Sequence, residues 1–205
     1  MESLAAFVHL YGWEFVQNLP FVAGSVAGMR LWNTGHAGAS VLIGLAGCVA
    51  SAALITLTEP YKLQYTAGQS KPSADLGQPA QIRELVTNSL AFTGGSLAAA
   101  WYVGGVTRFG SLPHTWAADV AVGGLAGAAV AMLQNSMAPR SAGGQAATWP
   151  HVAAFALIGP VILVVVRALL HVTGWPAVAG GILGLAAVMT LIICFVEYRP
   201  DLKPA

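Results

Sequence analysis

Several stretches of about 20 residues lack any charged side chain, and they restrict the possible folds more than any other feature of the chain. The clearest of them cover residues 36–58 and 177–196. A helix of this length and character can cross the hydrocarbon core of a membrane. Charged residues make up 8% of the chain, compared with roughly 25% in soluble domains. The sequence therefore predicts an all-α, polytopic transmembrane helical bundle.

One long polar segment, residues 59–84, divides what we interpret as a single membrane domain over residues 1–205. It separates an N-terminal unit, residues 1–58, from a longer unit, residues 85–196, and residues 197–205 form a polar tail. The second span is predicted to end at Glu59–Pro60, because proline disfavours helix in the residue before it. The third helix is predicted to begin at Pro79, since proline suits the first helical position. About six spans are predicted: 5–30, 36–58, 85–108, 115–133, 149–172 and 177–196.

The first of these spans is the least regular. Glu14, Gln17 and Asn18 interrupt its apolar character, and at 100° per residue they fall on one face with Tyr11. Pro20 removes a backbone donor. Two structures fit this pattern: one kinked span whose polar stripe faces other helices, or an amphipathic helix over residues 1–19 that lies in the membrane interface. The pattern favours the kinked span, and the alternative leaves five spans and an N-terminal interfacial helix.

The basic residues of the connecting segments predict the orientation of the chain. With six spans, six Lys and Arg residues lie on the side of the termini and three lie on the opposite side. Cytoplasmic segments are enriched in Lys and Arg, so both termini and the 59–84 loop are predicted to be cytoplasmic. The net charge of +1 argues against nucleic acid as a partner, and the lipid bilayer is the expected one.

Five polar residues are candidates for the path of a solute or an ion. A carboxylate inside a membrane span is costly, and such residues often mark functional sites. Glu14 is the carboxylate predicted to lie deepest, and Gln17 and Asn18 share its helix face. His114 and Asp119 bracket the start of the fourth span, where a helix N-terminus favours a carboxylate.

These features predict a small multi-pass membrane protein that transports a solute or an ion, or that serves as the membrane subunit of a larger complex. The alternative is a membrane-embedded enzyme for a lipidic or apolar substrate, with Glu14, His114 and Asp119 as acid–base groups. The sequence contains no Walker A, GxSxG or HExxH motif, and its histidines lack metal-binding spacing. No cofactor or metal is therefore predicted. Cys48 and Cys194 fall inside predicted spans and are interpreted as small core residues.

Small residues form three predicted helix-packing faces. In lipid, such faces allow helix backbones to approach closely. We expect them to join helices of one protomer, and the alternative is that one of them docks a second copy or a partner membrane subunit. Each face is a GxxxG pair: Gly24 and Gly28, Gly123 and Gly127, Gly180 and Gly184.

Basic and aromatic residues near the span ends complete the pattern. Arg167 and His171 lie one turn apart at the end of the fifth span. Such side chains can extend to lipid headgroups or bind an anionic lipid group, and the pattern favours the first interpretation. The six tryptophans mostly fall near predicted span ends, as is typical of the aromatic belt at membrane interfaces.

Overall fold

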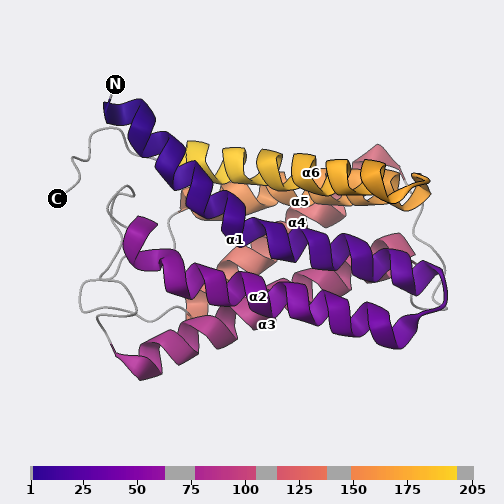
Figure 1. Cartoon of the computed structure of the whole chain (residues 1–205), viewed down its shortest axis with the longest axis horizontal. Helices are drawn as coiled ribbons and strands as arrows, with labels where there is room; N and C mark the ends of the chain where they lie inside the picture. Colours follow the sequence, from indigo (N-terminus) through magenta and orange to yellow (C-terminus); the bar gives the residue numbers. More distant parts are fainter. Residues whose placement is uncertain (1, 63–76, 105–114, 138–148, 198–205) are drawn as a thin grey trace.

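The computed structural model describes residues 2–62, 77–104, 115–137 and 149–197, and six helices occupy nearly all of these ranges (Figure 1). In chain order they are α1 (Glu2–Asn33), α2 (Ala37–Lys62), α3 (Gln78–Gly104), α4 (Trp116–Met137), α5 (Trp149–His171) and α6 (Trp175–Glu197). The predicted all-α bundle is confirmed, and each predicted span corresponds to one helix.

Four of the described helices contain segments that are long and apolar enough to cross a membrane, as expected for an integral membrane protein. These segments are Ala37–Thr58, Trp116–Gln134, Val152–His171 and Trp175–Phe195. The other two helices, α1 and α3, lie among them in the bundle but are more polar. Several of their polar side chains are buried between helices: Glu14, Gln17, Asn18, Thr87 and Asn88.

α1 is one continuous helix of 32 residues that passes through Pro20. Figure 1 shows that it changes direction along its length, as the kinked-span prediction requires. The hydroxyl of Ser51 donates a hydrogen bond to the backbone carbonyl of Gln17, in the turn before Pro20. Pro20 removes the helical donor for the carbonyl of Val16, so the Ser51 bond adds a contact between α1 and α2 next to the kink. The segment is therefore one continuous helix, and its placement as a membrane span or as an interfacial helix stays a prediction.

The apolar span within α2 ends at Thr58, as predicted. The helix itself continues for about one more turn, through Pro60 to Lys62. Proline has a fixed φ that is compatible with a helix, and it removes only its own backbone donor. A proline near the last turn therefore does not have to end the helix.

The alternating helix directions give the bundle two distinct ends (Figure 1). At one end, which we call the hairpin end, short turns join α1 to α2 and α5 to α6. These turns contain Gly35 with φ 84° and Gly174 with φ 97°, in a region that glycine occupies without steric cost. At the other, the termini end, α1 begins and α6 finishes.

The two GxxxG pairs of α1 and α4 pack inside the protomer as expected. A Cβ atom on Gly24 would lie 2.8 Å from the Cα atom of Gly47 in α2, and one on Gly123 would lie 2.7 Å from the Cα atom of Pro160 in α5. These separations are shorter than any ordinary Cβ contact, so the helix backbones touch where only glycine fits.

The third pair, Gly180 and Gly184, faces outward. Both residues are exposed on α6, and a Cβ atom at either position would meet no atom within 4 Å in the described part of the chain. The described part of the protomer therefore offers no packing partner for this pair. Docking of a second copy or a partner subunit on this face stays a prediction.

Arg30 connects the two hairpins at the hairpin end. Its Nη1 donates to the backbone carbonyls of Leu169 at 2.5 Å and Val172 at 2.9 Å. Carbonyls at a helix C-terminus lack helical partners and carry partial negative charge. The guanidinium also lies 5.6 Å from the ring centre of Trp175, which a cation–π contact allows. Arg30 thus caps α5 from another helix.

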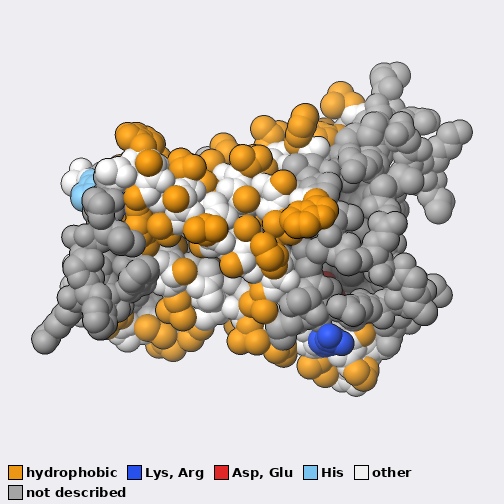
Figure 2. Space-filling model, turned by 180° about the vertical axis from the view of Figure 1, so that it is seen from behind, with side chains coloured by type: hydrophobic (Ala, Val, Ile, Leu, Met, Phe, Trp, Pro, Cys, Tyr) orange, Lys and Arg blue, Asp and Glu red, His pale blue; other side chains and the backbone are white. Residues whose placement is uncertain are grey.

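Apolar side chains form both the core and much of the outer surface. The core includes Val26 of α1 and Val178 and Ala186 of α6. Cys48 and Cys194 are buried and form no disulfide, which confirms their interpretation as core residues. Figure 2 shows apolar side chains over most of the described part of one face, with few charged groups. Lipid is the solvent that such a surface suits.

Candidate functional site

A cavity of about 70 Å³ lies inside the bundle. Residues of α1, α3, α4, α5 and α6 line it, and they are apolar or glycine except for Asn18, Ser25 and Ser96. No Asp, Glu, Lys or Arg side chain belongs to the lining that the described residues form. A cavity of this size has room for a few water molecules or for one small organic molecule.

One wall of the cavity is formed where α1 and α3 meet. Asn18 and Ser25 lie on one face of α1, two turns apart, and both line the cavity. The hydroxyl oxygens of Ser25 and Ser96 are 3.0 Å apart. The Sγ atom of Cys48 lies 3.6 Å from the same Ser96 hydroxyl. This wall therefore offers an amide and two hydroxyls, whereas the facing wall of α4 and α5 is apolar.

The three sequence-predicted residues of α1 are all buried. Glu14, Gln17 and Asn18 are 4%, 1% and 6% exposed. Asn18 donates its Nδ2 to the hydroxyl of Thr190 at 3.3 Å, and the other amide atom remains for the cavity because the amide carries both donor and acceptor groups. Gln17 donates to the hydroxyl of Thr58 in α2. Glu14 lies one turn from Asn18, toward the termini end.

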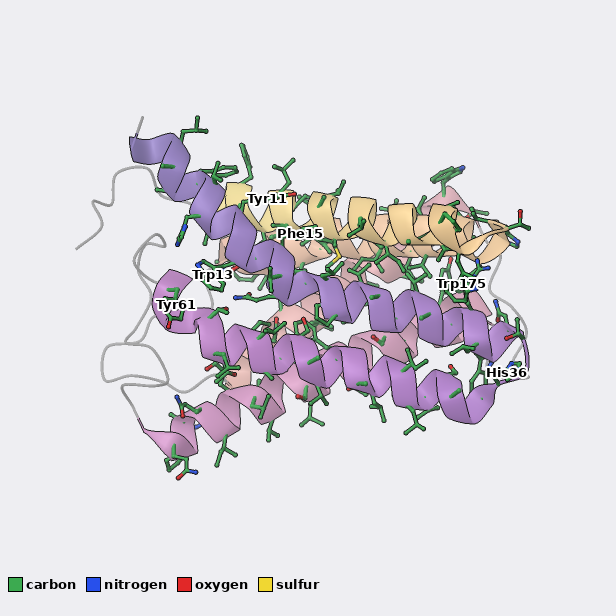
Figure 3. All side chains as sticks on the ribbon, viewed as in Figure 1. Tyr11, Trp13, Phe15, His36, Tyr61 and Trp175 are labelled. Atoms are coloured by element: carbon green, nitrogen blue, oxygen red, sulfur yellow. The ribbon has the colours of Figure 1, made fainter. Side chains whose placement is uncertain are left out.

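Aromatic side chains fix the part of α1 that carries these residues (Figure 3). The ring of Trp13 stacks on Tyr61 of α2 with centroids 5.3 Å apart. The Tyr11 hydroxyl donates to the carbonyl of Ala187 in α6 at 3.4 Å. Trp13 is therefore packed between helices, unlike Trp175, which is exposed at the hairpin end and fits the predicted aromatic belt.

A charged cluster from three helices lies at the hairpin end of the cavity. The Nη1 and Nη2 atoms of Arg167 (α5) donate to the two carboxylate oxygens of Asp119 (α4) at 2.8 and 2.6 Å. The hydroxyl of Tyr102 (α3) donates to the same carboxylate at 2.8 Å. Asp119 is 4% exposed. Each member lies one helical turn beyond a cavity-lining residue of its own helix: Ala98, Gly123 and Leu163.

The prediction that Arg167 extends to lipid headgroups is wrong. A buried carboxylate lies within its reach, and a bidentate, charge-assisted pair is stronger than a contact with hydrated headgroups. The predicted stabilisation of Asp119 by the N-terminus of α4 explains only part of its environment. At this N-terminus the Thr115 hydroxyl accepts a hydrogen bond from the backbone N–H of Ala118 at 3.2 Å. The Asp119 side chain points to Arg167 instead. His171 is exposed at the end of α5, where a headgroup contact stays a prediction.

An amide pair lies beyond the cavity toward the termini end. Gln134 of α4 donates its Nε2 to the Oδ1 of Asn88 in α3 at 2.9 Å, and Asn88 is 8% exposed. These residues lie one turn beyond the lining residues Phe92 and Val130. α3 and α4 are thus bridged by polar side chains at both ends of the cavity.

The sequence-predicted site is only partly assembled. Glu14 lies in the half of α1 nearer the termini end, whereas Asp119 lies in the first turn of α4 at the hairpin end. The third predicted acid–base residue, His114, is outside the described residues. Within the described ranges, no group of three His, Cys, Asp or Glu residues could hold a metal ion.

Sequence reasoning missed Ser96, Tyr102, Asn88 and Gln134. The sequence contained a signal for two of them, because Asn88 and Ser96 are separated by eight residues and so share a face of α3.

No family model, characterised protein or solved structure matches this chain.

Proposed function

We propose that this protein is a membrane carrier for a small uncharged solute. The observation that supports it is the central cavity, which is flanked toward each end of the bundle by hydrogen-bonded polar side chains. A carrier needs a site that can be closed toward either side of the membrane, and closures made of breakable polar contacts suit this requirement. A purely structural subunit needs no such cavity.

The lining favours an uncharged solute. A charge brought into an apolar cavity without an opposite charge loses its hydration and gains little in return. The α1–α3 wall offers the Asn18 amide and the hydroxyls of Ser25 and Ser96, while Ile158 and Leu163 of α5 lie among the apolar lining. The solute class that fits is a small, mainly apolar molecule with one or two hydrogen-bonding groups.

The two closures differ in strength. They lie about 20 Å apart along α3, at 1.5 Å per residue. The hairpin end has a bidentate charged pair with a tyrosine hydroxyl, and the termini end has one hydrogen bond between neutral amides. Charge-assisted hydrogen bonds are roughly twice as strong as neutral ones. The termini end should therefore open more readily, and Glu14 and Gln17 would border the path opened there.

Two other functions make different demands. A membrane subunit of a larger complex is favoured by the exposed Gly180 and Gly184 face of α6. It requires no access to the cavity. A lipid-acting enzyme requires acid–base groups at one depth in a cleft that is open to one side, and Glu14 and Asp119 are separated.

Access to Ser96 from each side of the membrane distinguishes these functions. The variant is Ser96→Cys with Cys48 and Cys194 replaced by alanine, reconstituted in sealed vesicles. A charged, membrane-impermeant thiol reagent is added to one side at a time, and labelling is followed by mass spectrometry. For a carrier we expect reaction from both sides, because each closure opens in turn.

A matched control is Ala186→Cys in the same background. Ala186 is fully buried in the core and does not line the cavity, so we expect no labelling from either side. Labelling of Ser96→Cys from neither side would refute the carrier and favour a packing subunit. Labelling from one side only would also refute it and favour an enzyme cleft.

A further inference from the structure

The α3–α4 contact at the termini end brings together four side chains that carry oxygen atoms. Glu84, Thr87 and Asn88 share one face of α3, because positions i, i+3 and i+4 are neighbours on a helix. Gln134 reaches them from α4, since its Nε2 donates to the Oδ1 of Asn88 at 2.9 Å. The two helices therefore hold a carboxylate, a hydroxyl and two amide groups close to one another.

Two of these oxygen atoms lack a hydrogen-bond partner. The Oγ1 of Thr87 and the Oε1 of Gln134 are both buried and bond to no other group in the part of the chain that the structure describes. Thr87 is 2% exposed. Buried polar atoms without a partner are rare in native proteins, and each one calls for an explanation such as a bound water or ion.

The chemistry of the group favours a cation. An amide oxygen is an acceptor only, and the Asn88 Oδ1 keeps a second lone pair after it has accepted the bond from Gln134. Glu84 adds a carboxylate, one of whose oxygen atoms is also buried. Hard cations bind to carboxylate, hydroxyl and carbonyl oxygens. The group contains a single carboxylate, so a monovalent ion fits better than a divalent one.

We propose that a sodium ion binds between α3 and α4, held by oxygen atoms of Glu84, Thr87, Asn88 and Gln134. The ion would leave the Asn88–Gln134 hydrogen bond intact and add a second connection between the same two helices. In the carrier proposed above, it would hold the termini end of the cavity closed. That role rests on the proposed function, whereas binding of the ion does not.

Binding is tested on the purified full chain in detergent, without any transport assay. The thermal unfolding midpoint is measured as NaCl replaces choline chloride at constant ionic strength, and ²²Na⁺ binding is measured directly. A ligand that binds only the folded state raises the midpoint. At ten times the dissociation constant we expect a rise of about 3–6 °C that saturates with Na⁺.

Two conservative variants locate the ion. Thr87→Val removes the hydroxyl at nearly constant volume, and Glu84→Gln removes the charge. Each should weaken the apparent Na⁺ affinity by about tenfold or more, as expected for loss of one ligand. The matched control is Thr56→Val, because the Thr56 hydroxyl bonds only the carbonyl of Ala52 in its own helix among the described contacts. Its Na⁺ affinity should not change.

Three results would overturn the proposal. One is an unfolding midpoint that is the same in Na⁺ and in choline. Another is a Na⁺ effect that survives both variants, which would place the ion elsewhere. The last is an ordered water only, shown by destabilisation of Thr87→Val to the same extent in both salts without ²²Na⁺ binding. If Thr87→Val fails to fold, Glu84→Gln decides alone. If the protein binds Na⁺ but its Ser96→Cys variant is labelled from neither side of the membrane, the sodium site is supported and the carrier function is refuted.

Discussion

Asp119 exchanges its water contacts for two residues of other helices, Arg167 and Tyr102. A buried charge is tolerated when another charge and additional hydrogen bonds replace its hydration. The Arg167 guanidinium also lies 5.6 Å from the ring centre of Tyr102. The three side chains therefore form one unit, and removal of one member affects the other two.

We predict that Asp119→Asn lowers the free energy of unfolding by about 2–3 kcal/mol. Breaking a buried pair costs about 3–5 kcal/mol when one charge is left alone, and the 23% exposure of the Arg167 side chain reduces this loss. The measurement is reversible unfolding in mixed detergent micelles. The exposed Arg83 gives a control, since Arg83→Gln should change the free energy by less than about 0.5 kcal/mol.

The double variant Asp119→Leu with Arg167→Met tests whether the pair acts as a unit. It leaves no lone charge, so it should lose less stability than the two single replacements added together. Losses that simply add would contradict the coupling.

For single residues, the sequence predicted which side chains are buried better than it predicted their interaction partners. The polar stripe of α1 was predicted to face inward because its residues recur at helical spacing, and Glu14, Gln17 and Asn18 are buried. The partner of Arg167 could not be predicted in the same way. It lies 48 residues away on another helix, and helical periodicity contains no information on which helices are neighbours.

Helix contacts within the bundle depend on where small residues lie in three dimensions. The α4–α5 contact is so close that a Cβ on Gly127 would meet the backbone of Phe155, 2.7 Å from its carbonyl carbon. The outward pair on α6 has the same spacing and no such neighbour. GxxxG spacing therefore predicts a smooth helix face, but it does not predict which face is used.

We predict opposite results for one substitution at two matched positions. Gly127→Ala should lower the free energy of unfolding by about 1–3 kcal/mol, because backbone atoms of α5 cannot move aside without separating the helices. Gly184→Ala should be neutral or stabilise by up to about 1 kcal/mol, since alanine favours helix over glycine. Unfolding in micelles measures both. Equal destabilisation at the two positions would contradict the assignment of the α4–α5 contact.

The bundle as a whole is joined by long-range contacts at both ends. Arg30 connects the two hairpins at the hairpin end, and the Asn88–Gln134 bond connects α3 to α4 at the termini end. The number and type of helices were predictable from charge-free runs and their polar boundaries. The cavity was not, because it arises where five helices meet and no single segment encodes it.

We predict that the 59–84 loop faces the cytoplasm. Its tip is outside the described residues, and the prediction rests on the excess of Lys and Arg on the side of the termini. The test is Ser73→Cys with Cys48 and Cys194 replaced by alanine, labelled in intact cells. An impermeant thiol reagent should label the cysteine only after the membrane is opened. Labelling of intact cells would reverse the orientation of the chain.

The contact between Arg30 and the end of α5 has a consequence for biosynthesis. Arg30 and its acceptor Leu169 are separated by 139 residues. At a synthesis rate of about 5–20 residues per second, Arg30 leaves the ribosome roughly 7–28 s before Leu169 is made. During that interval the first hairpin carries an unsatisfied guanidinium at the membrane surface, which lipid phosphates or a chaperone must accommodate. A chain truncated before α5 would keep that cation exposed permanently, a feature by which the cell could recognise it as incomplete.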